Sequence, residues 1–150
     1  MNDENLHLYK VIIELVADRE GKFLLEDPEK PVIHVATPPE FPGGKAGIHS
    51  PEDLFVGAVA SCKMTTFCAM AEKLSLDFSD LRIAAVGYVG KSESRGLAFT
   101  KVTTKLTFSI KKEEDRNIAE RCLDLTSRYC LVTNSLKTEV EMDYEISVLS

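Results

Sequence analysis

The sequence predicts a single α+β domain that spans residues 1–150. Segments rich in β-branched or alternating residues, which are typical of strands, are interrupted by two stretches with helical features. The order along the chain is strands, a helix, two strands, a helix and a last strand. A composition with 44% hydrophobic and 28% charged residues is ordinary for a globular protein, and a chain of this length buries about two thirds of its unfolded surface.

Three strands are expected in the N-terminal third, at Leu8–Ala17, Lys22–Leu25 and Val32–Ala36. Residues Asp18–Gly21 form the expected turn between the first two, with Gly21 suited to a positive φ. The segment TPPEFPGGKAGIH, residues 37–49, follows as a loop, because its proline and glycine content excludes regular structure.

The stretch SPEDLFVGAVASCKMTTFCAMAEKL, residues 50–74, is expected to form one long helix. Ser50 is a favourable N-cap, Pro51 suits the first helical position, and Asp53 stands where a capping-box acid would lie. One side of the helix is expected to carry Leu54, Phe55, Ala58, Val59, Cys62, Thr65, Thr66, Ala69 and Leu74, and the other Val56, Ala60, Phe67, Cys68 and Ala71.

This helix is apolar nearly all round, and a helix of that kind is buried. A chain of 150 residues is too short to cover both of its sides. We therefore expect a second subunit to pack against the helix.

Two strands are expected after the long helix. Leu81–Val89 is the first, and GKSESRG, residues 90–96, is a hairpin-like connection. Thr100–Ile110 alternates strictly, as in a half-exposed antiparallel strand. Its apolar side carries Val102, Thr104, Leu106, Phe108 and Ile110, and its polar side Lys101, Thr103, Lys105, Thr107 and Ser109.

A second helix and a last strand complete the expected fold. The helix covers about Glu113–Arg128 and ends near RYCLVTNSLK, which presents Cys130. Its core face is expected to hold Ile118, Ala119, Cys122, Leu123 and Leu125. The last strand, Val140–Val148, alternates apolar with polar residues.

The charge pattern excludes several classes of partner. The net charge is −6, and no segment gathers lysine and arginine into a stripe, so we expect neither nucleic acid nor a membrane as a partner. No apolar run approaches the roughly 20 residues that span a bilayer. The N-terminal stretch MNDENLHLYK is acidic and polar, unlike a signal peptide, so a cytoplasmic location is expected.

The chain has four cysteines, Cys62, Cys68, Cys122 and Cys130, and structural disulfides are rare in a reducing compartment. No spacing is C-x-x-C, and the three histidines are scattered, so neither a metal site nor another cofactor is expected. The cysteines are therefore either buried small apolar residues or redox-active thiols.

Two motifs, SPEDLFVGAVASC on the first helix and SRYCLVTNSL at the end of the second, resemble the OsmC/Ohr family of organic hydroperoxide resistance and osmotically inducible proteins. The resemblance covers nearly the whole chain and implies an intertwined homodimer with the long helices buried at its centre. It implies that Cys62 is the peroxidatic nucleophile and Cys130 the resolving thiol. It also implies that Arg19, in ADREGKF, and Glu52, in SPEDLF, assist the first cysteine.

Two positions depart from the family pattern. Leu131 follows Cys130 where the family often has proline, and Lys63 follows Cys62 where a small or apolar residue is common.

The chemistry of a thiol peroxidase agrees with these roles. The thiolate is the attacking species, and burial in a helix would raise the pKa of a thiol, so a nearby cation such as Arg19 is required. Glu52 would hold the guanidinium bidentately. Cys130, at a helix end, is better placed to resolve a sulfenic acid than Cys68 or Cys122, which are expected to serve packing.

Glu52 and Cys62 are ten residues apart on the predicted helix, a rise of about 15 Å. A glutamate side chain cannot bridge that distance. If Glu52 supports the chemistry of a Cys62, that thiol is expected to belong to the other subunit.

The leading hypothesis is a peroxiredoxin-like hydroperoxide reductase, whose disulfide is reduced by a dithiol such as a lipoyl protein, as the resemblance implies. Two alternatives stay open. One is a non-enzymatic module that binds a fatty or aromatic ligand in an apolar pocket at the dimer interface. The other is a redox sensor, in which a disulfide between Cys62 and Cys130 alters the binding of a partner.

Overall fold

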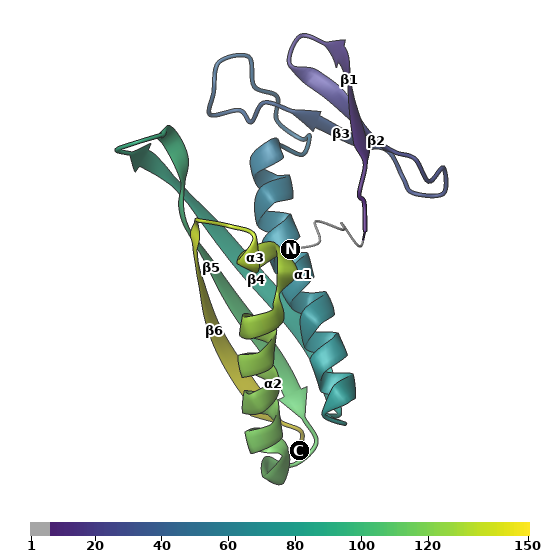
Figure 1. Ribbon diagram of the computed structural model, residues 1–150, viewed down its shortest axis with the longest axis vertical. Helices are drawn as coiled ribbons and strands as arrows, with labels where there is room; N and C mark the ends of the chain where they lie inside the picture. Colours follow the sequence, from purple (N-terminus) through teal and green to yellow (C-terminus); the bar gives the residue numbers. More distant parts are fainter. Residues whose placement is uncertain (1–6) are drawn as a thin grey trace, which may run out of the picture. The chain divides into compact units, whose positions relative to one another are not determined.

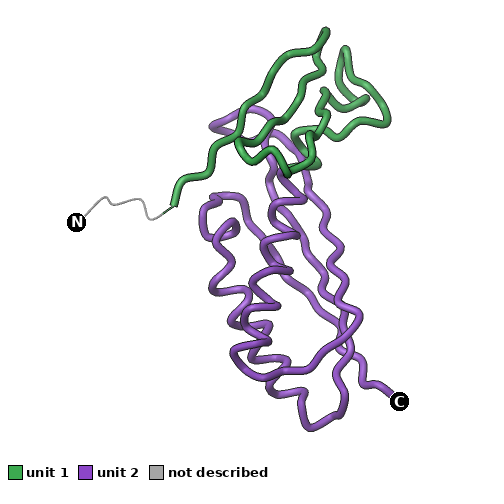
Figure 2. Tube along the Cα trace, turned by 90° about the vertical axis from the view of Figure 1, so that its right-hand side faces the viewer, with its two compact units in different colours: residues 1–54 green, residues 55–150 purple. Residues whose placement is uncertain are grey.

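Two three-stranded sheets and two main helices make up the computed structural model, which describes residues 7–150. The chain divides into two units, residues 1–54 and residues 55–150, which Figure 2 shows in green and purple. The α+β class predicted from the sequence is confirmed. The prediction of one domain over the whole chain stays a prediction.

The first unit contains the sheet β1-β2-β3, in which each neighbouring pair is antiparallel (Figure 1). Its strands are β1 (Val11–Ala17), β2 (Glu20–Leu25) and β3 (Ile33–Ala36). All three expected strands are therefore present, with β2 starting two residues earlier than the sequence indicated. Every residue of β1 is exposed within this chain.

The turn between β1 and β2 differs from the prediction. Asp18 adopts the positive φ, 49°, whereas Gly21 lies inside β2. Aspartate tolerates the left-handed region because its short polar side chain can bond to the local backbone. Gly21 is needed for another reason: a Cβ there would lie 3.0 Å from the carbonyl oxygen of Glu14 on the neighbouring strand.

The loop before the first helix contains turns and bends, as predicted, and it leads into a capping box. The backbone N–H of Asp53 donates to Ser50 Oγ at 3.1 Å, and the N–H of Ser50 donates to Asp53 Oδ2 at 2.9 Å. These hydrogen bonds lower the pKa of Asp53. They fix the start of α1 (Pro51–Lys73), so the predicted N-terminus of this helix is confirmed.

The second unit contains the sheet β4-β5-β6. β4 (Phe78–Ser92) and β5 (Gly96–Ile110) form a long antiparallel hairpin. β6 (Glu139–Val148) pairs parallel to β5, so this sheet is mixed rather than purely antiparallel as expected. A parallel pair needs a crossover connection, which η1 (Glu113–Asp115), α2 (Arg116–Tyr129) and α3 (Leu131–Asn134) provide.

In the second unit, α1 and α2 lie side by side over one face of the sheet (Figure 1). The core between them is apolar: Phe67, Ala71, Leu76, Leu106, Phe108, Ile110, Ala119, Cys122 and Leu123. The alternation predicted for β5 is confirmed, because its five predicted inward residues from Val102 to Ile110 are all buried.

The sequence indicated burial on both sides of α1, whereas within this chain only one narrow face of the helix is buried. Its buried residues are spaced four apart: Val59, Lys63, Phe67 and Ala71. Ala58, Thr65 and Ala69, which were expected beside Val59, are exposed in this chain. A helix that is apolar all round has no preferred face, so periodicity alone could not select the one that meets the sheet.

On α2 the core face is largely as expected. Ala119, Cys122 and Leu123 are buried, whereas Ile118 is 39% exposed and Leu125 is half-buried. Thr126 takes the inner position instead. Its hydroxyl donates to the carbonyl oxygen of Cys122 at 2.8 Å, so a polar side chain is satisfied inside the core.

By length and composition, α1 could cross a membrane, with 22% of its apolar window buried inside the structure. The expectation that no apolar run approaches the roughly 20 residues that span a bilayer was therefore wrong. Core helices of globular proteins meet the same criterion, and α1 packs Phe67 and Ala71 into the core of the second unit.

Replacement of Phe67 tests this core. Phe67 packs against the rings of Phe108 and Phe78, with centroids 4.8 and 5.0 Å away. We expect Phe67→Ala to lower the free energy of unfolding by about 3–5 kcal/mol, measured by chemical denaturation. The control Ile118→Ala, on the outer side of α2, should cost less than about 1 kcal/mol. Equal losses in the two variants would contradict the assigned core.

Candidate functional site

The structure brings two of the predicted site residues, Cys62 and Cys130, together in the second unit. Cys62 lies in α1 and is half-buried, whereas Cys130 is fully buried. Cys130 separates α2 from α3, with an extended backbone (φ −66°, ψ 106°) that ends one helix and caps the next. The expected position of Cys130 at a helix end is therefore confirmed.

The sulfur of Cys62 is surrounded by hydrogen-bond donors. The backbone N–H of Val132 in α3 donates to Cys62 Sγ at 3.5 Å. Thr66 Oγ1 lies 3.9 Å from the same sulfur, one helical turn further along α1. The thiol of Cys130 and the N–H of Leu131 also act on it.

These contacts change the ionisation of Cys62. Burial raises the pKa of its thiol, but the hydrogen bonds from Val132, Cys130, Thr66 and Leu131 more than offset that effect. The pKa of Cys62 therefore lies below the ordinary value of a cysteine. The thiolate, which is the reactive form, therefore makes up a larger share of Cys62 than of an ordinary cysteine at the same pH.

The other two cysteines differ from this pair. Burial raises the pKa of Cys122 to about 11. Its sulfur lies against the carbonyl oxygen of Phe67, so Cys122 behaves as a core residue, as expected. Cys68 is exposed in this chain, although it was expected to serve packing.

Lys63 is a charged residue beside Cys62 that is not among the predicted site residues. It is 1% exposed and lies on the buried stripe of α1, next to Cys62. Burial lowers the pKa of its ammonium, and the charges of Cys130 and Cys62 oppose that shift. Its spacing of four residues from Val59 and from Phe67 indicates that Lys63 shares their face of the helix. Lysine is rarely buried, so that spacing did not lead to a prediction of burial.

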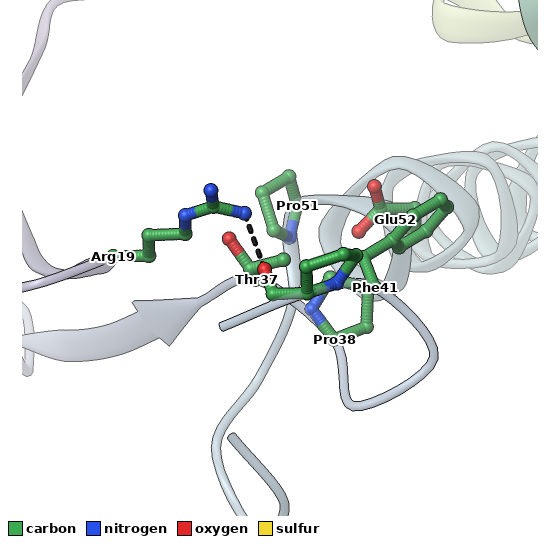
Figure 3. Close-up of a pocket in the computed structure, with 7 residues that line it drawn as sticks. Arg19, Thr37, Pro38, Phe41, Pro51 and Glu52 are labelled. Carbon is green, nitrogen blue, oxygen red and sulfur yellow. Dashed lines mark hydrogen bonds between the residues drawn. The ribbon is translucent and has the colours of Figure 1, made fainter. Parts of the chain in front are cut away.

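Arg19 and Glu52 lie together in the first unit, where they line one pocket of about 320 Å³ (Figure 3). The rest of its lining comes from Thr37, Pro38, Phe41, Pro42 and Pro51. Figure 3 shows the guanidinium of Arg19 turned to the loop, where Nη1 donates to the carbonyl oxygen of Pro42. A Cβ on Gly43 would lie 3.1 Å from Arg19 Cδ, so glycine leaves room for this side chain.

The bidentate ion pair expected between Arg19 and Glu52 is not formed within residues 7–150 of this chain. Oε2 of Glu52 is buried and has no hydrogen-bond partner among the described residues. The carboxylate therefore has an unused acceptor in the pocket that Arg19 also lines.

The four predicted residues thus form two groups: Arg19 with Glu52 in residues 1–54, and Cys62 with Cys130 in residues 55–150. Over the part of the chain that the structure describes, no group of three or more histidine, cysteine, aspartate or glutamate residues could hold a metal ion. The chemistry that this arrangement offers is that of an activated thiol with a second thiol in reach.

Comparisons with known proteins identify the family and the fold of this chain. The family model of OsmC-like proteins matches residues 44–145. An uncharacterised protein of Bacillus subtilis (strain 168), YmaD, is 23% identical over 120 residues, which cover 78% of this chain and 79% of that protein.

Solved structures share the fold. An OsmC-like protein of unknown function from Vibrio cholerae has a TM-score of 0.81 at 22% identity, covering 93% of this chain and 100% of that one. The organic hydroperoxide resistance protein OhrB of Bacillus subtilis has a TM-score of 0.65 at 19% identity, covering 95% of this chain and 100% of that one. The resemblance drawn from the two cysteine motifs is thereby confirmed, and the chain belongs to the OsmC-like protein family.

Proposed function

We propose that this protein is a thiol peroxidase that reduces organic hydroperoxides through Cys62 and Cys130. The OsmC-like fold suggests a redox or peroxide-resistance role. The observation that carries the proposal is the environment of Cys62. Its sulfur accepts the N–H of Val132 and lies within reach of the thiol of Cys130.

The reaction proceeds in three steps. The Cys62 thiolate attacks the distal oxygen of the hydroperoxide, which gives a sulfenic acid and an alkoxide that takes up a proton to leave as an alcohol. The thiol of Cys130 then condenses with the sulfenic acid, forming a disulfide and releasing water. An external dithiol, such as a lipoyl protein, reduces the disulfide and restores both thiols.

Arg19 and Glu52 are proposed to assist this chemistry from the second subunit of a homodimer. α1 is continuous from Pro51 to Lys73, so the rise of about 15 Å between Glu52 and Cys62 excludes direct support within one chain. Exposed apolar residues support a dimer: Val11, Ile12, Ile13, Leu15 and Val16 of β1, and Met64 of α1.

A redox sensor is the second candidate, and one contact favours it. A disulfide between Cys62 and Cys130 would remove the thiolate that the N–H of Val132 binds, and would so alter α3. The neighbouring Leu131 is 68% exposed, so a change in α3 would alter a surface that a partner protein can contact.

Peroxide consumption separates these functions. With cumene hydroperoxide and a dithiol, the wild type should turn over repeatedly and Cys62→Ser should be inactive. Cys130→Ser should consume the first equivalent and then stall, because no resolving thiol remains. Cys68→Ser, a matched control on the exposed side of α1, should keep full activity. Disulfide formation without turnover would favour the sensor, and no reaction at all would refute both.

Disulfide mapping tests the pairing. One equivalent of hydroperoxide should link Cys62 to Cys130 within one chain, because the thiol of Cys130 is close enough to act on the thiol of Cys62. Trypsin places each of the four cysteines in its own peptide, since Lys63, Arg121 and Arg128 separate them. Mass spectrometry should find the peptides of residues 46–63 and 129–137 joined. A bridge to Cys68 or Cys122 would overturn the assignment.

Subunit mixing tests the shared site. The wild type should sediment as a dimer at micromolar concentration. Co-refolding of Cys62→Ser with Glu52→Ala should restore part of the activity, because one site then combines an intact Cys62 with an intact Glu52 of the other subunit. No recovery above the Glu52→Ala background, with heterodimers verified by native mass spectrometry, would rule out a site shared between subunits.

A further inference from the structure

A lysine inside the core of the second unit calls for an explanation. Lys63 is 1% exposed and stands between Val59 and Phe67 on the face of α1 that meets the sheet. Burial of an ammonium without a partner is costly, so buried charges are normally paired. Within residues 7–150, no carboxylate lies at ion-pair distance from Lys63.

Among the described residues, the two thiols are the groups whose negative charge would act on Lys63. Cys62 precedes it on α1, and Cys130 stands at the junction of α2 and α3. The inner face of β5 contributes no titratable group, since its buried residues are Val102, Thr104, Leu106, Phe108 and Ile110. A buried cation that lacks a carboxylate partner therefore lies close to two thiols, and the negative charge of a thiolate there would compensate it.

We propose that Lys63 is the internal counter-ion of the thiol pair, so that its ammonium holds one negative charge shared by the sulfurs of Cys62 and Cys130. The inference deepens the proposed function and, for its role in peroxide reduction, rests on it. Lys63 acts through the thiols and is a positioning residue. It belongs to the same unit as both cysteines, so it favours the thiolate without Arg19 and without a second subunit.

Oxidation then changes the charge of this site. A thiolate, a thiol, a hydroperoxide and one proton give a disulfide, an alcohol and water, and the ammonium of Lys63 supplies the proton that the departing alkoxide takes up. The disulfide is neutral, so the amine that remains is neutral as well. Reduction by the external dithiol returns the proton to Lys63 as the thiolate re-forms.

Alkylation of Cys62 tests the counter-ion directly and needs no peroxide. The rate with iodoacetamide is measured against pH in a Cys68→Ser background, so that the peptide bearing Cys62 reports one thiol even when the cleavage site at Lys63 is lost. In Lys63→Met the rate at pH 7 should fall about tenfold or more, because each unit of pKa changes the thiolate fraction tenfold. Lys63→Arg should keep most of the reactivity, since it retains the charge.

Lys73→Met, in the last turn of α1, removes an exposed lysine and is the matched control. Its pH profile should coincide with that of the wild type. A Lys63→Met profile that also coincides with the wild type would overturn the proposal. A shift in this profile without peroxide turnover would refute the proposed function alone, and turnover with unshifted profiles would refute the counter-ion alone.

A second measurement leaves Lys63 in place. The pKa of Lys63 is followed by NMR of its side chain in the wild type and in Cys62→Ser/Cys130→Ser. Loss of both thiols should lower the pKa of Lys63 by at least one unit, because the anion is gone while the burial stays. An unchanged pKa would overturn the proposal even if Lys63→Met failed to fold.

Discussion

The parallel pairing of β6 with β5 is the constraint on which the second unit depends. Residues 101–110 of β5 pair with residues 139–148 of β6 in the same direction, so the chain must return along the sheet before β6 can begin. α2 makes this return over the face that α1 also covers. The return path ends at Cys130, where the helix is interrupted, and the interruption turns the backbone N–H of Val132 toward Cys62. The proximity of the two thiols thus depends on the order and direction of the strands.

Local environment separates cysteines that look alike in the sequence. Cys62 and Cys122 are both removed from solvent in part or in full, and burial raises the pKa of each. At Cys62 the backbone and side-chain donors more than offset this effect. At Cys122 the hydrogen bond of Thr126 does not offset it, and the sulfur faces a carbonyl oxygen of α1. Donors from a chain segment 70 residues away therefore distinguish the reactive thiol from the inert one.

The sequence predicted what depends on neighbouring residues. The capping box of Ser50 and Asp53 and the alternation of β5 are local patterns, and both hold. What depends on distant contacts could not be predicted. The parallel direction of β6 is one case, and the face of α1 that takes Lys63 inward is another. Of the candidate site, the motifs gave the residues, but the contact between Cys62 and Cys130 required the crossover. The sequence also could not predict that Arg19 and Glu52 form no ion pair within residues 7–150 of one chain.

The contact between Cys62 and Cys130 joins two points that are far apart along the chain. A bond between them would close a loop of 68 residues and reduce the entropy of the unfolded chain, a stabilisation of about 4 kcal/mol in the simplest treatment. The disulfide formed on oxidation would then be a reversible covalent link between α1 and the crossover connection. The thermal stability of this protein would then depend on its redox state, and the reduced form would unfold at a lower temperature than the oxidised form.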